Sequence, residues 1–80
     1  MKHLLAFKCR TDGIVEVVCD RDGLTLLIKR LQLLLSRGGH EHLMTPSWSG
    51  NELTEMDAGS EEFLAHQVNF YVRSHKETEE

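Results

Sequence analysis

The alternation of apolar and polar residues predicts two short strands near the start of the chain. Within residues 3–9, Leu5, Phe7 and Cys9 would lie on one face, and residues 14–19 alternate in the same way. Asp12-Gly13 between the two segments is a strong hairpin signal, because the tight turn needs positive φ and Gly adopts it freely. We therefore expect a β-hairpin.

Apolar residues then recur at spacings of three and four, which is typical of an amphipathic helix. Asp20 or Asp22 can cap the amino end of this helix, and Gly38-Gly39 can end it. We expect the helix over residues 21–36, with its apolar stripe mostly buried and its charged residues outside or in the last turn. The stripe residues are Leu24, Leu27, Ile28, Leu31, Leu34 and Leu35, and the outer or last-turn residues are Lys29, Arg30, Gln32 and Arg37. On this prediction Leu31→Asp would bury an unpaired charge and unfold the domain.

Two further strands are expected over residues 40–44 and 67–74, with Val68, Phe70 and Val72 pointing inward. The segment of about twenty residues between them is long for a compact domain, and such segments are often functional. The predicted fold is α+β: a four-stranded antiparallel or mixed sheet covered on one face by one long helix, in the order β-β-α-β-β. One domain would span residues 1–74, followed by a frayed acidic tail over 75–80.

Composition narrows the classes of function. The 80 residues carry a net charge of −4, which disfavours nucleic acid as a partner because phosphate binding needs clustered Lys and Arg. No apolar run is long enough for a membrane span, and the first residues lack the features of a signal peptide, so we expect a cytoplasmic protein. Cys9 and Cys19 are then expected to be reduced, buried and inert.

His40 and His42 lie two residues apart, so on a strand both side chains share one face. A His-x-His pair can supply two metal ligands, and a small metal-binding protein or metal-dependent enzyme centred on this pair is the alternative function. His66 and Glu52 have no spacing that argues for them as further ligands. Ser47 lacks the Gly-x-Ser-x-Gly context of a hydrolase nucleophile, so we expect no catalytic residues and no cofactor.

Trp48 lies between Pro46 and Gly50, where its indole would either anchor the loop on the core, the interpretation we favour, or project as an interface anchor. The sheet face away from the helix would be only partly polar. It would display Tyr71 and, in addition, Ile14, Val18 and Met44 if their sides of the strands point that way. Two alternatives stay open for that face: a twofold homodimer, or coverage by the long loop.

The sixteen residues from Gly39 to Thr54 contain two histidines, the only proline and the only tryptophan. This block resembles the signature of the immunity protein 32 family of bacterial polymorphic-toxin systems, Gly-x-His-x-His-Leu-Met-x-Pro-x-Trp-x-Gly-x-Glu-Leu. The matching residues are Gly38, His40, His42, Leu43, Met44, Pro46, Trp48, Gly50, Glu52 and Leu53.

The resemblance implies an α+β fold and a non-catalytic protein that binds and neutralises a cognate toxin. We expect the partner to contact the histidine-tryptophan loop and the uncovered sheet face. The expected binding residues are His40, His42, Met44, Pro46, Trp48, Asn51, Glu52 and Tyr71.

Overall fold

The computed structural model describes residues 3–55 and 62–73, and in them it confirms the α+β class and the β-β-α-β-β order. The elements are β1 (Leu5–Cys9), β2 (Val15–Cys19), α1 (Arg21–Arg37), β3 (His40–Met44), a 3₁₀ turn (Pro46–Trp48) and β4 (Gln67–Tyr71). The predicted acidic tail over residues 75–80 lies outside the described residues.

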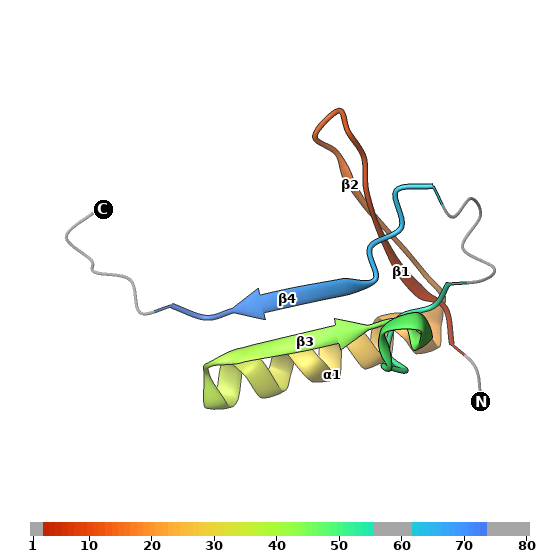
Figure 1. Cartoon of the computed structure of the whole chain (residues 1–80). Helices are drawn as coiled ribbons and strands as arrows, with labels where there is room; N and C mark the ends of the chain where they lie inside the picture. The colour runs from red at the N-terminus through yellow and green to blue at the C-terminus, as the bar shows by residue number, and fades with distance from the viewer. Residues whose placement is uncertain (1–2, 56–61, 74–80) are drawn as a thin grey trace.

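Local chemistry builds the first hairpin. Gly13 has φ 93°, and the Asp12 carboxylate accepts a hydrogen bond of 3.2 Å from the backbone N–H of Ile14. Arg10 then pairs with Asp12 at 2.7 Å and with Glu16 at 3.3 Å, which links the turn to both strands. The turn end of the β1-β2 hairpin projects away from α1 and from the β3-β4 sheet (Figure 1).

The four strands form two two-stranded antiparallel sheets, β1-β2 and β3-β4, where a single sheet was predicted. Within the described residues, one isolated bridge between Lys8 and Leu64 connects β1 to the segment that leads into β4. The N–H of Cys9 donates to the carbonyl of Phe63 at 2.9 Å beside it. The N–H of Ala65 donates to the carbonyl of Phe7 at 2.8 Å, and the chain pairs regularly with β3 only from Gln67 onward.

The prediction of α1 is confirmed to within one residue of its end. The Asp20 carboxylate accepts the N–H of Gly23 at 2.7 Å, and Gly38, with φ 75°, ends the helix by donating to the carbonyl of Leu34. Within the described residues no helix combines the length and the apolar character that crossing a membrane requires.

The helix lies along β3, as Figure 1 shows, but the predicted burial of its apolar stripe is wrong for four of the six residues. Leu34 is buried and Leu27 packs partly against the core. The exposed fractions of the other four are 45% for Leu24, 46% for Ile28, 37% for Leu31 and 85% for Leu35. A charge at Leu31 would therefore remain near solvent, and the severe effect predicted for Leu31→Asp no longer follows.

Two sets of contacts hold a different flank of α1, away from these four exposed residues, against the sheets. Gly23 approaches the first strand so closely that an added Cβ would lie 1.8 Å from the carbonyl oxygen of Leu4. Further along, Arg30 and Arg37 both pair with Glu41, a strand residue that is only 9% exposed. Arg30 thus faces the sheet, which corrects its predicted outer position.

The core is small and is shared by both sheets. Leu5, Phe7, Leu43 and Leu53 form its buried cluster, and Phe70 meets the Phe7 ring edge-on at a centroid distance of 6.4 Å. Both cysteine thiols are free. Cys19 is partly buried against this cluster and Cys9 is exposed, so the expectation of two buried thiols is wrong for Cys9.

Candidate functional site

Successive residues of β3 have opposite environments. Glu41 and Leu43 are buried toward α1, so His40, His42 and Met44 lie on the other side of the strand. The antiparallel register pairs these three with Tyr71, Asn69 and Gln67 of β4. We call this surface of six residues the histidine face: His40, His42, Met44, Gln67, Asn69 and Tyr71.

Three rings gather on the histidine face. The ring centroid of His40 lies 4.8 Å from that of His42 and 5.9 Å from that of Tyr71. His42 and Tyr71 meet nearly edge-to-face at 6.4 Å. Asn69 orients one of the imidazoles: its side-chain oxygen accepts from Nδ1 of His42 and, at 2.9 Å, from the amide of Gln67. The result is an ordered aromatic cluster outside the hydrophobic core.

A tight turn leads away from β3. The carbonyl oxygen of buried Thr45 accepts the backbone N–H groups of Trp48 and Gly50, both at 2.9 Å. Pro46 opens the turn, where its missing N–H costs nothing. Gly50 packs so closely on Met44 that an added Cβ would lie 2.5 Å from the Met44 side chain and carbonyl. The glycine of the signature is therefore required by packing.

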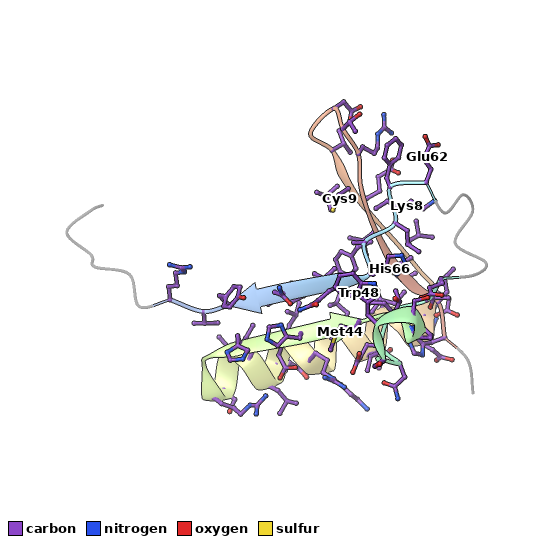
Figure 2. The ribbon with its side chains drawn as sticks, in the orientation of Figure 1. Lys8, Cys9, Met44, Trp48, Glu62 and His66 are labelled. Carbon is purple, nitrogen blue, oxygen red and sulfur yellow. The ribbon has the colours of Figure 1, made fainter. Side chains whose placement is uncertain are left out.

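Trp48 is half exposed, so the favoured sequence interpretation of a buried indole is wrong. Its exposed fraction is 53%, and its ring stacks on His66 at 5.9 Å with an interplanar angle of 4°. Figure 2 shows Trp48, His66 and Met44 together at the carboxyl end of β3. One face of the indole is supported by the imidazole while the side chain stays accessible.

Hydrogen bonds from the turn support this stack. Nδ1 of His66 lies 2.8 Å from the hydroxyl of Thr45. The Glu55 carboxylate accepts the N–H of Ser47 at 2.8 Å and lies 3.6 Å from the same imidazole nitrogen. Hydrogen bonds from the Ser47 hydroxyl, the Ser47 N–H and the Thr45 hydroxyl hold the pKa of Glu55 below its ordinary value. The carboxylate thus favours the ordered turn while it is ionised.

The structure divides the predicted binding residues into groups. Four of them, His40, His42, Met44 and Tyr71, lie together on the histidine face, and Pro46 and Trp48 form the adjoining turn. Asn51 is exposed beyond the turn.

Glu52 alone among the predicted binding residues is turned toward the scaffold. Its carboxylate accepts the N–H of Met44 at 3.1 Å and pairs with Arg30 at 3.4 Å. Its side chain is 15% exposed. The contacts give Glu52 a role in holding β3 and the turn against α1.

The metal alternative requires further ligands beside His40 and His42. Across residues 3–55 and 62–73, no group of three or more His, Cys, Asp or Glu side chains is arranged to hold a metal ion. The two extra candidates from the sequence are engaged elsewhere, His66 with Thr45 and Glu52 with Met44 and Arg30. The geometry therefore adds no support to a metal site.

No local signal in the sequence identifies His66 as the partner of Trp48. Eighteen positions separate them, and only the pairing of β4 with β3 brings them together, through the bond from the Thr45 N–H to the carbonyl of His66 at 3.0 Å. The contact of Asn69 with His42 likewise depends on the register of the two strands.

Comparison with known proteins identifies the family. The chain belongs to the family described as Immunity protein 32, whose model matches residues 14–68 and so covers β2 through the first part of β4. This confirms the resemblance inferred from the signature. No curated protein and no solved structure matches the chain.

Proposed function

We propose that this protein binds and neutralises a cognate bacterial toxin in the cytoplasm, as a non-catalytic inhibitor. Membership of an immunity protein family supports the general role. The observation that carries the proposal is the histidine face with Trp48 beside it, because these rings are ordered by neighbours and yet contribute nothing to the core.

The chemistry of these residues suits a protein partner. Tyr and Trp are enriched at binding hot spots, where a rigid ring gives a large contact area at little cost in conformational entropy. His40, His42 and Tyr71 form the centre of the proposed surface, with Trp48 stacked on His66 at one end. A toxin docked here would contact rings that are already oriented, so binding would order few side chains.

The remaining predicted residues have secondary parts in the proposal. Met44 lies within the surface, while Pro46 and Asn51 lie at its edge. Glu52 acts indirectly, because its bond to the N–H of Met44 keeps the strand and the turn in place. Inhibition would then follow from covering the toxin surface, with no bond made or broken.

The test is co-expression with the polypeptide encoded by the neighbouring open reading frame, which the proposal expects to be a toxin. We expect the unmodified protein to restore growth and to co-purify with that polypeptide. Tyr71→Ala and Trp48→Ala should each weaken binding at least tenfold, which is the size expected when a hot-spot ring is removed. Calorimetry or surface plasmon resonance measures the affinity.

Leu33→Ala is the matched control. The exposed fraction of Leu33 is 48%, similar to the 53% of Trp48. Leu33 lies on α1, away from the histidine face. Its substitution should leave affinity unchanged. Equal losses for Leu33→Ala and Tyr71→Ala, or full protection by a protein lacking both rings, would contradict the proposed surface.

A further inference from the structure

Four exposed aliphatic side chains run along one flank of α1. We call them the aliphatic stripe: Leu24, Ile28, Leu31 and Leu35. They are the part of the predicted apolar face that remains outside the core once Gly23, Arg30 and Leu34 turn toward the sheets. On soluble proteins, exposed apolar side chains that form a contiguous patch larger than a few hundred Å² usually mark an interface.

The spacing of the stripe indicates what kind of surface would cover it. Its members are separated by four, three and four residues, which is the a/d spacing of a coiled-coil seam over slightly less than two heptads. Side chains at this spacing interlock with those of another helix crossing at about 20°. A second helix with the same spacing is therefore a fitting occupant, and every copy of this chain carries one.

The charges around the stripe agree with pairing of identical copies. Its outer border is formed by Thr25 and Gln32, which are uncharged, so two stripes can meet without repulsion between like charges. Arg21 continues the same line at the amino end of α1. In an antiparallel pair it would lie near the carboxyl end of the partner helix, whose partial negative charge favours a cation. In a parallel pair the two Arg21 side chains would face each other.

We propose that a second copy of this chain covers the aliphatic stripe, with the two α1 helices antiparallel across a twofold axis. Leu24 then packs near Leu35 of the other copy, and Ile28 near Leu31. This places self-association on the helix, away from the histidine face that the sequence suggested for a dimer. The toxin surface stays free in such a dimer, and the proposal stands apart from toxin binding.

The first test is the molar mass of the full-length protein in solution, without toxin, by sedimentation equilibrium over roughly 1–100 µM. We expect a monomer–dimer equilibrium. Leu35→Lys should raise the dissociation constant at least tenfold, and because Leu35 is 85% exposed the monomer fold should be unaffected. Leu33→Lys is the matched control on the opposite flank of α1 and should leave the equilibrium unchanged.

The second test fixes the orientation. In a Cys9→Ser and Cys19→Ser background, a mixture of Leu24→Cys and Leu35→Cys chains should form the mixed disulfide under mild oxidation, and Leu35→Cys alone should cross-link poorly. Efficient self-linking by Leu35→Cys would overturn the antiparallel arrangement. A monomer at every concentration, or a dimer that survives Leu35→Lys but dissociates on Tyr71→Ser, would overturn the proposal.

Discussion

The two faces of the β3-β4 sheet are built from alternate residues of the same short strands, yet they differ in burial and in the contacts they make. On the helix side, Glu41 and Leu43 are buried and join α1 to the sheet. On the other side, His40 and His42 contact rings and polar groups of the same face. The period of two in a strand thus places residues that the fold requires and residues of the proposed binding surface within the same five positions.

The same division runs through the turn. Thr45, Gly50 and Leu53 are fixed by burial or close approach, whereas Trp48 keeps about half of its surface exposed. A signature shared by a family can therefore mix residues that the fold requires with residues available to a partner. Measurements of stability and of binding on the same variants would separate the two groups.

The largest effect on stability is expected from Leu43→Ala. Leu43 is fully buried in the core cluster, so its truncation leaves a cavity and should lower the free energy of unfolding by about 3 kcal/mol. Urea denaturation followed by circular dichroism measures it. His42→Ala, one residue away on the other face, should change stability by less than about 0.5 kcal/mol. Similar losses for the two variants would refute the division between the faces.

Glu41→Ala tests the polar part of the buried face. The carboxylate pairs with Arg30 and Arg37 from a site that is 9% exposed, so its removal takes one partner from each guanidinium group, while Arg30 keeps its pair with Glu52. We expect a loss of about 2 kcal/mol, below the range for a fully buried pair because both arginines reach solvent. Glu16→Ala is the control, since its pair with Arg10 is exposed and should contribute less than about 1 kcal/mol. Equal effects would mean that burial of Glu41 adds nothing.

His66→Ala tests the contact that supports the half-exposed Trp48 ring. Losing the stack with Trp48 and the hydrogen bond with Thr45 should lower stability by about 1 kcal/mol. Tryptophan fluorescence should shift to longer wavelength as the indole becomes more hydrated. Toxin affinity should fall by less than with Trp48→Ala, because the ring would remain present. An unchanged emission spectrum would show that His66 does not position the indole.

The smallest expected effect is on the pH dependence of stability. It comes from the carboxylates of Asp20, which caps α1, and Glu55, which holds the turn after β3. The pKa of Asp20 is lowered from 3.8 by the N–H groups of Gly23 and Leu4, and that of Glu55 is lowered from 4.5 by Ser47. A group with a lowered folded pKa stabilises the protein above its unfolded pKa and loses this contribution as pH falls through the folded value. The contribution is therefore present at neutral pH and lost in acid.

Asp20→Asn isolates this term, because Asn caps a helix as well as Asp but carries no charge. The unmodified protein should be the more stable at pH 6, and the difference should shrink below pH 3.8. Glu55→Gln should behave in the same way below 4.5. Denaturant midpoints from about pH 6 to about 2.5 give both differences, and a difference that stays constant over this range would exclude the charge as its source.

The elements and the family could be predicted because their signals are local. Turn chemistry at Asp12-Gly13, the cap at Asp20 and the glycines after Arg37 each act within a few residues, and they placed the helix and the hairpin correctly. The predicted set of partner residues rested on the family signature, and the structure separates Glu52 from the others through its bonds to Met44 and Arg30.

The order of the elements, their approximate limits and the alternation that divides β3 into two faces all follow from local sequence patterns. The buried flank of α1 does not, because it depends on the close approach of Gly23 to Leu4 and on the pairing of Arg30 and Arg37 with Glu41. The stack of Trp48 on His66 likewise depends on the tertiary structure, since that contact follows from the register between β3 and β4. Periodicity reports which side chains are apolar, but the side of a helix that reaches the core is chosen by the contacts it finds there.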